Sequence, residues 1–212
     1  MFIPLVDSLR CIAGHEETWL VASIDRSEER DIREGFLGCP ICLAEYPIRE
    51  GVVFFGVDPS ASTETPMPAR VEDDDAIRLA AALDLTDPRM VAVLFGSCGA
   101  YAPVIRGFSP AHLLLVNPPS GISSGDGVSV VRTASVAPVA RGSMDAVAVD
   151  SGASQEMQES LASALRGGGR IAGPADYPLP ADARELTRDD RIWVAEMPER
   201  ATSPLISLRR AR

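Results

Sequence analysis

Short apolar runs recur through the second half of the chain, separated by polar or turn-forming segments. The runs are VAVLF at 91–95, HLLLV at 112–116, VSVV at 128–131 and DAVAV at 145–149. Continuous apolar runs of this length are typical of strands that a parallel sheet buries on both faces. We therefore predict four adjacent strands in the second half of the chain.

A helical period appears between and beside these runs. Ile77, Leu79, Ala80, Leu83 and Leu85 recur at helical spacing behind an acidic start, and 154–164 is a second helical segment that we expect to end at the glycines 167–169. The closing segments RIWVAEM and SPLISLRR are expected to form an edge hairpin. Alternating strands and helices predict a doubly wound α/β sheet, which binds ligands at the carboxyl ends of its strands.

The first part of the chain has a different pattern. Residues 57–75 are rich in Pro, Ser and Thr and lack apolar periodicity, so we predict a linker between a module at 1–56 and the α/β domain at 76–212. A module of 56 residues is too small to bury a large core, and such modules commonly need a metal or a disulfide for stability. VVFF at 52–55 is more apolar than such a module can bury, so we expect it to dock on the α/β domain.

Composition narrows the function classes. The net charge of -10 gives an acidic chain little attraction to phosphate groups, so we do not expect direct nucleic-acid binding. No apolar run is long enough for a membrane span, and the first residues do not read as a secretory signal. We expect a cytoplasmic protein. In that reducing compartment, paired cysteines indicate a metal or redox site.

The cysteines supply one candidate site. Cys11 and His15 have C-x-x-x-H spacing, and Cys39 and Cys42 have C-x-x-C spacing behind a glycine. Two short-range pairs on separate turns are the usual origin of a tetrahedral zinc site, so we predict one structural Zn²⁺ on these residues. The alternative is that no metal binds, with His15 a surface histidine and Cys11 a small buried side chain. A thioredoxin-like pair would need a long helix after it, whereas 44–55 is predicted as turn and strand.

The segments that carry these residues resemble a known family. LRCIAGHEE at 9–17 and LGCPICLAEYPIREGVVFF at 37–55 are similar to the small zinc-ribbon proteins that act as activator subunits of tRNA, rRNA and protein methyltransferases. The resemblance implies a non-catalytic ribbon that packs against a methyltransferase. His15 stands where those proteins more usually have a cysteine.

The region from about 76 to 209 resembles a second family, the class I S-adenosylmethionine-dependent methyltransferases. The best match is VAPVARGSMDAVAVDSG, at 136–152, with the helix and the RGGGRI that follow it. The resemblance implies a methyltransferase-type sheet whose first strand, 91–95, leads into a glycine loop that approaches the cofactor. It also implies that a carboxylate side chain after the second strand binds the hydroxyl groups of the cofactor ribose.

The cofactor positions depart from that pattern. The loop VLFGSCGAY keeps Gly96 and Gly99, but Leu94 or Phe95 stands where an acid is expected and Tyr101 crowds the loop. Asn117 replaces the ribose carboxylate, and one amide cannot accept both hydroxyl protons. If S-adenosylmethionine binds at all, we expect it to contact Gly96, Ser97, Gly99, Asn117 and Asp150.

Other polar residues near the strands have simpler interpretations. Asp145 is expected to cap the turn before the fourth strand, whereas Asp150 is left open between a helix cap and a substrate or cofactor contact. Cys98 is expected to fill a tight turn, because no histidine lies near it in sequence.

Two functions remain. The first is a non-catalytic methyltransferase-like scaffold or accessory protein with a structural zinc ribbon, which binds another protein through the ribbon or the α/β domain. The alternative is an active S-adenosylmethionine-dependent methyltransferase with its activator ribbon in cis.

Overall fold

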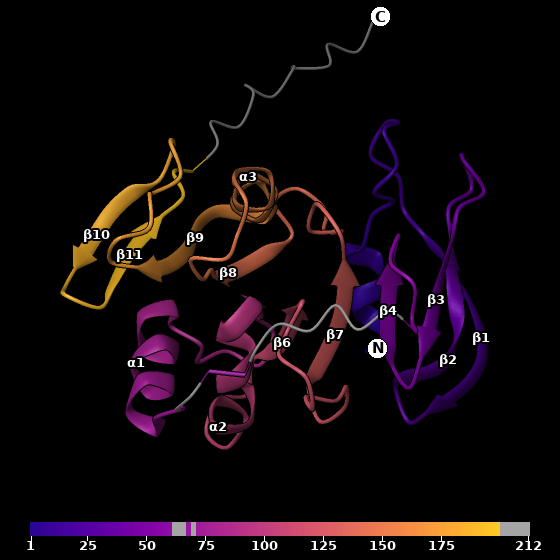
Figure 1. The fold of residues 1–212 in the computed structure, drawn as a ribbon, viewed down its shortest axis with the longest axis horizontal. Coiled ribbons are helices and arrows are strands. Elements are labelled where there is room, and N and C mark those ends of the chain that lie inside the picture. Colours follow the sequence, from indigo (N-terminus) through magenta and orange to yellow (C-terminus); the bar gives the residue numbers. More distant parts are fainter. Residues whose placement is uncertain (61–66, 69–70, 200–212) are drawn as a thin grey trace, which may run out of the picture.

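The structure is a computed structural model that describes residues 1–60, 67–68 and 71–199. Its described strands form one eleven-stranded sheet in the order β1-β2-β3-β4-β7-β6-β5-β8-β9-β11-β10 (Figure 1). The strands are β1 (Val21–Glu28), β2 (Asp31–Gly38), β3 (Glu45–Arg49), β4 (Val52–Phe55), β5 (Val91–Phe95), β6 (His112–Val116), β7 (Val128–Thr133), β8 (Met144–Ala148), β9 (Leu165–Pro174), β10 (Arg184–Arg188) and β11 (Ile192–Glu196). The helices are α1 (Asp73–Leu83), α2 (Ala102–Arg106) and α3 (Gln155–Ala164), with 3-10 turns η1 (Ile3–Ser8) and η2 (Gly96–Tyr101).

The central strands form a doubly wound sheet, as the sequence predicts. Strands β7, β6, β5, β8 and β9 are parallel, and β11 and β10 complete the sheet in antiparallel orientation. Helices α1 and α2 cover one face, and α3 covers the other (Figure 1). Side chains alternate between the two faces: Val93 joins the core under α3, and Leu94 joins the core under α1 and α2.

Local sequence explains where the longer helices begin. Three aspartates, Asp73 to Asp75, occupy the first turn of α1, where the helix dipole favours negative charge. Ser154 caps α3, because its hydroxyl accepts a hydrogen bond from the Met157 N–H at 3.2 Å.

The connection between strands defines a crevice. β5 has β6 on one side and β8 on the other, and the chain visits β6 and β7 before it crosses back to β8. The carboxyl ends of β5 and β8 therefore form the topological switch point, where open α/β sheets bind ligands.

The N-terminal β region continues this same sheet. Strands β1 to β4 run antiparallel to one another, and β4 pairs in parallel with β7 from Val52↔Val130 to Phe55↔Thr133. Val53 and Phe55 are fully buried in the core that also contains residues of β6 and β7. The apolar run 52–55 thus lies against the α/β part, as expected.

Three details differ from the sequence interpretation. Residues 44–55 contain the expected turn and strand, but a further strand, β3, precedes them, so the segment forms the β3–β4 hairpin. The glycines 167–169 do not cap α3, because Leu165 is already extended and pairs with Met144, so the glycines lie within β9. The segment RIWVAEM does contribute β11, but its hairpin partner is β10; SPLISLRR lies outside the described residues.

Much of the expected linker also lies outside the described residues, and α1 begins within its last three positions. Among the described helices, each is too short or too polar to cross a bilayer.

Candidate functional sites: a metal centre and a glycine loop

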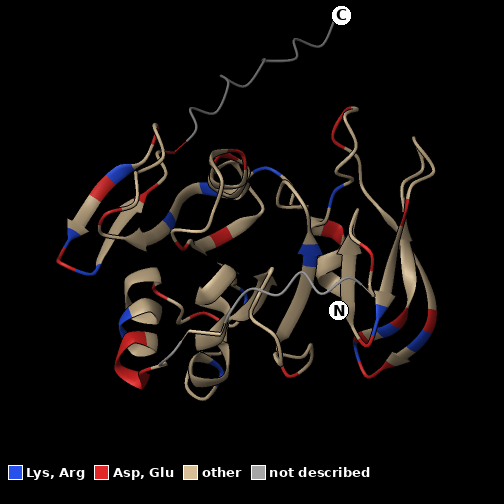
Figure 2. Ribbon diagram, in the orientation of Figure 1, with Lys and Arg blue, Asp and Glu red and all other residues tan. Residues whose placement is uncertain are grey.

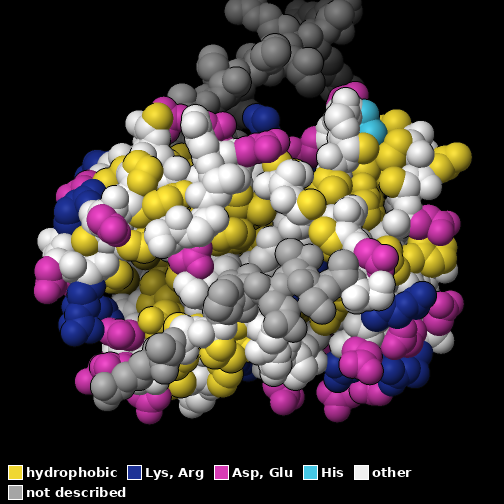
Figure 3. Space-filling model, in the orientation of Figure 1, with side chains coloured by type: hydrophobic (Ala, Val, Ile, Leu, Met, Phe, Trp, Pro, Cys, Tyr) yellow, Lys and Arg dark blue, Asp and Glu magenta, His cyan; other side chains and the backbone are white. Residues whose placement is uncertain are grey.

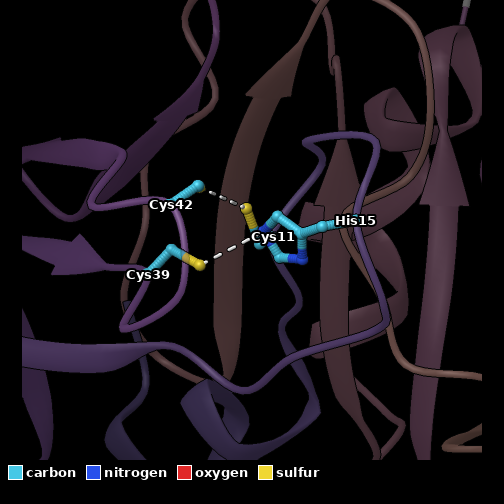
Figure 4. A group of neighbouring side chains, drawn as sticks. All are labelled: Cys11, His15, Cys39 and Cys42. Atoms are coloured by element: carbon cyan, nitrogen blue, oxygen red, sulfur yellow. Dashed lines mark hydrogen bonds between the residues drawn. The ribbon is translucent and has the colours of Figure 1, made fainter.

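Two loops bring the four predicted zinc ligands together. Cys11 and His15 lie in the loop between η1 and β1, and Cys39 and Cys42 lie in the turn between β2 and β3 (Figure 4). The turn is closed by hydrogen bonds from the Cys39 N–H to Ala44 O and from the Leu43 N–H to Cys39 O. The ligand atoms of all four side chains lie within 4.8 Å of one another.

The spacing of these atoms fits a zinc ion. Zn–S bonds of about 2.3 Å and Zn–N bonds of about 2.0 Å give tetrahedral edges of roughly 3.8 Å between two sulfurs and 3.6 Å between sulfur and nitrogen. The Cys11 Sγ–Cys42 Sγ distance is 3.6 Å, and the Cys39 Sγ–His15 Nε2 distance is 3.4 Å. All four cysteines are free thiols, so no disulfide competes for these atoms.

Neighbouring groups orient two of the ligands. His15 Nδ1 lies 2.6 Å from Glu16 O; if Nδ1 donates its proton there, Nε2 keeps the lone pair that a metal needs. The Tyr46 hydroxyl lies 3.0 Å from Cys11 Sγ and accepts a hydrogen bond from the Ile12 N–H. Sequence reasoning missed this role of Tyr46, although Tyr46 lies within the segment 37–55 that carries the resemblance to zinc-ribbon proteins.

The thiols differ in their readiness to ionise. Burial opposes ionisation of Cys39, but the N–H groups of Cys42 and Ile41 and the neighbouring thiols outweigh it, so the pKa of Cys39 falls to about 6. Burial raises the pKa of Cys11. A metal that bound here would itself deprotonate the remaining thiols, and binding would release protons.

The glycine loop after β5 is filled by an aspartate. Asp150, two residues after the end of β8, accepts hydrogen bonds from the Ser97 N–H at 2.6 Å and the Ser97 hydroxyl at 2.7 Å. It also accepts the Gly152 N–H at 2.9 Å. Gly96 has φ +59°, and a Cβ atom there would lie 2.3 Å from Asp150 Oδ2. The space that Gly96 leaves by lacking a Cβ is therefore occupied by the Asp150 side chain of the same protein.

The second glycine of the loop is also in contact with protein. A Cβ atom on Gly99 would lie 2.8 Å from the Pro118 side chain, which follows β6. The loop after β5 and the segment after β6 are thus in van der Waals contact at the point where the resemblance places a cofactor ribose.

Asn117 faces β7. Its side-chain oxygen accepts the Thr133 N–H at 2.9 Å, and its amide donates to Thr133 O at 2.9 Å. Asn117 has φ +52°, a left-handed conformation that asparagine adopts more readily than most residues. These two bonds join the ends of β6 and β7.

Asp145 differs from the turn-capping interpretation, and of the two roles left open for Asp150 the cap of α3 is excluded. Asp145 lies inside β8, where its carboxylate accepts the Val91 N–H at 2.7 Å and pairs with Arg166. The cap of α3 is Ser154, not Asp150. Each aspartate therefore ties β8 to a neighbouring segment. Cys98 fills the turn as expected, and burial together with the charge of Asp150 raises its pKa to about 12, so it is a poor nucleophile.

A cavity of about 240 Å³ lies beside the switch point. Ser97, Cys98 and Tyr101 of η2 line one side, and the ends of β8 and β9 line another. Arg78 and Arg191 also line it, and these pair with Asp189 and Asp75 respectively. Of the five predicted cofactor contacts, this cavity reaches Ser97 and Asp150 but not Gly96, Gly99 or Asn117.

Comparisons with known proteins give likeness of fold only. No family model and no curated protein matches the chain. Among solved structures, the complex of the Haloferax volcanii Trm112 methyltransferase activator with a methyltransferase is 17% identical, covers 46% of this chain and 50% of its own, and has a TM-score of 0.39. Geranyl diphosphate methyltransferase in complex with S-adenosylmethionine is 17% identical, with 49% of each chain covered and a TM-score of 0.39. The tRNA (m1A58) methyltransferase TrmI from Aquifex aeolicus is 12% identical, with 63% and 72% covered and a TM-score of 0.43. The chain spans about half the length of the first two structures. The described chain is a doubly wound α/β sheet that an N-terminal cysteine- and histidine-rich β region extends.

Proposed function

We propose that this protein is a non-catalytic, methyltransferase-like scaffold or accessory protein, stabilised by one structural zinc ion. In this proposal residues 1–56 form the ribbon, 57–75 form a linker and 76–212 form the α/β domain. Another protein is its partner. The net charge of -10 argues against nucleic acid as a direct partner. The proposed location is the cytoplasm.

The occupied glycine loop carries the proposal. A cofactor that approached Gly96 would have to displace the Asp150 carboxylate from three hydrogen bonds. Hydrogen bonds to charged groups contribute on the order of 1.5 to 3 kcal/mol each. Even if the cofactor replaced part of them, a deficit of about 3 kcal/mol would weaken binding roughly a hundredfold.

The side of the loop that faces β6 supports the same conclusion. The amide of Asn117 is committed to the Thr133 backbone and cannot supply the two acceptors that a ribose carboxylate offers. The contact between Gly99 and Pro118 would also have to open. Both changes would be needed in addition to the movement of Asp150.

The metal has a structural role in this proposal. Zinc would be held by Cys11, His15, Cys39 and Cys42, and four protein ligands leave no open position for a reacting water. Metal analysis of protein purified without added zinc should find about one equivalent. Fully folded, metal-free protein would contradict this part of the proposal.

Calorimetric titration tests the absence of cofactor binding. S-adenosylmethionine and its demethylated product should give no binding heat with the unmodified protein at tens of micromolar. The Asp150→Ala variant, in which the position over Gly96 is empty, should still not bind the cofactor, because Asn117 and the contact between Gly99 and Pro118 are unchanged. Micromolar binding by the unmodified protein would refute the proposal.

One observation favours an active methyltransferase with its ribbon in cis. The 240 Å³ cavity lies at the switch point and is lined by Ser97 and Asp150. If the titration detects the cofactor, this cavity is where the rest of the binding site should be sought.

A further inference from the structure

Four large apolar side chains are exposed at the tip of the N-terminal β region. Their exposed fractions are 69% for Trp19, 63% for Val21, 56% for Ile41 and 79% for Leu43. We call these four residues the tip patch. Folding gains little from apolar groups that stay in water, and an apolar patch on a folded protein usually marks a binding surface.

The four residues lie at one end of the sheet. Val21 pairs with Gly38, and Gly38 directly precedes the turn that carries Ile41 and Leu43. The loop that leads into Trp19 touches the same turn, because Cys11 Sγ lies 3.6 Å from Cys42 Sγ. Figure 3 shows hydrophobic side chains gathered over this end of the molecule, beside a histidine.

Leu43 is the least expected member of the patch. It has φ +61°, a conformation that glycine and asparagine adopt readily and leucine rarely does. A buried leucine could compensate for that strain by packing, but Leu43 is largely exposed. A strained backbone at an exposed apolar residue points to a use other than folding.

Acidic side chains border the patch together with arginine (Figure 2): the Arg10 guanidinium lies over the Trp19 ring, 5.3 Å from its centroid. Glu16 lies in the loop between η1 and β1. Glu45 begins β3 and pairs with Gly38 of β2, whose other neighbour is Val21 of β1. Neither glutamate forms an ion pair with another described residue. Glu17 interacts with Arg10 and Arg141. A zinc ion held by three thiolates and one neutral imidazole would add a formal charge of -1, since the thiolates outnumber its two positive charges.

This charge selects among possible occupants. A second copy of the chain would bring the same acidic groups against the patch, and the phosphates of a nucleic acid would be repelled. Edge-strand addition along β1 is disfavoured, because that strand has register irregularities at Ile24, Arg26 and Ser27 and carries charged side chains.

We propose that the tip patch docks a segment of another protein that presents apolar side chains flanked by Lys or Arg. This inference rests on the scaffold function proposed above and identifies its partner-binding surface. The apolar side chains cover Trp19 and Leu43, and the basic ones lie against Glu16 and Glu45.

Photo-crosslinking in the source cells tests the location and the occupant. A photo-reactive phenylalanine derivative is placed singly at Trp19, Leu43 and, as the control, Leu186 of β10, which is 43% exposed. We expect the two tip positions to capture the same protein through a segment that contains Lys or Arg beside apolar residues, and the control to capture none of it. Adducts of two copies, nucleic-acid adducts, equal capture at Leu186 or no adduct would each overturn the proposal.

The captured protein is then purified and titrated against the full chain. Leu43→Gly should weaken binding at least tenfold without lowering the melting temperature, because glycine accepts the left-handed backbone. Glu45→Arg should also weaken binding, and by less at high salt, whereas Leu186→Ala should not. Equal binding by wild type and Leu43→Gly would overturn the proposal.

The two proposals fail separately. Each tip variant is also assayed for zinc content and for S-adenosylmethionine binding. If the variants keep their zinc and bind no cofactor, but no partner protein is found at the tip patch, only the docking surface is refuted. If every variant binds the cofactor, the scaffold function is refuted, and the crosslinks alone decide on the docking surface.

Discussion

Asn117→Asp supplies the carboxylate that the resemblance to class I methyltransferases implies after the second strand, yet we expect it to damage this protein. The amide of Asn117 donates to Thr133 O at 2.9 Å, and aspartate has no donor for that carbonyl when ionised. The carboxylate would instead set a negatively charged oxygen against Thr133 O, and Thr133 is buried.

The cost can be worked from these contacts. The lost neutral hydrogen bond contributes about 1 kcal/mol, and the unsatisfied carbonyl that faces a carboxylate adds about 1 kcal/mol or more. A total of about 2 kcal/mol corresponds to a melting temperature lower by roughly 4–8 °C for a chain of this size. Cofactor binding should remain absent, because Asp150 and Pro118 still occupy the loop.

Thermal and chemical denaturation at neutral pH measure this effect. Ser135→Asp is the matched control, since it adds the same charge at an exposed position nearby and should change stability little. Below about pH 4 the new carboxyl group becomes protonated and can donate, so the penalty should shrink. An Asn117→Asp protein as stable as wild type, or one that binds S-adenosylmethionine, would refute the reasoning.

Three further predictions concern other parts of the molecule. Cys42→Ser should lower the bound zinc from about one equivalent to none and destabilise the N-terminal β region, which metal analysis and denaturation would measure. Zinc retained by this variant would exclude Cys42 as a ligand. Gly96→Ala should destabilise wild type more than it destabilises an Asp150→Ala background, because its Cβ would lie 2.3 Å from Asp150 Oδ2; a double-mutant cycle with no coupling would contradict this contact. Burial and the nearby Arg106 charge lower the pKa of His112 to about 4, so the unfolded chain takes up this proton first and stability should be lost as the pH falls from 6.5 to about 4. That loss is at most about 3 kcal/mol, and His112→Gln should remove it from urea-denaturation profiles; identical profiles would contradict the assignment.

The sequence predicts the fold through features that local chemistry determines. The apolar runs at β5 to β8 are buried on both faces, and α1 begins with the acidic turn that its dipole favours. The predicted set of zinc ligands is equally local, because each pair lies on its own turn and only the approach of the two turns has to be inferred.

The contacts that long-range packing determines could not be predicted. Asp150 resembles a helix cap in sequence, but its partner Ser97 is 53 residues away. The extended path of the glycines 167–169 depends on the pairing of Leu165 with Met144 in another strand. The sequence alone shows that Asn117 departs from the pattern of the methyltransferases that it resembles, whereas its bonds to Thr133 depend on how β6 and β7 end.

A crystal structure of the protein grown with excess S-adenosylhomocysteine distinguishes a scaffold from a cofactor-binding enzyme. In a scaffold, Asp150 remains on the Ser97 N–H and hydroxyl, Gly99 stays against Pro118, and no ligand density lies beside the loop. Density for the nucleoside beside Gly96 and Gly99, with Asp150 displaced, would contradict the scaffold function and establish a cofactor-binding enzyme fold.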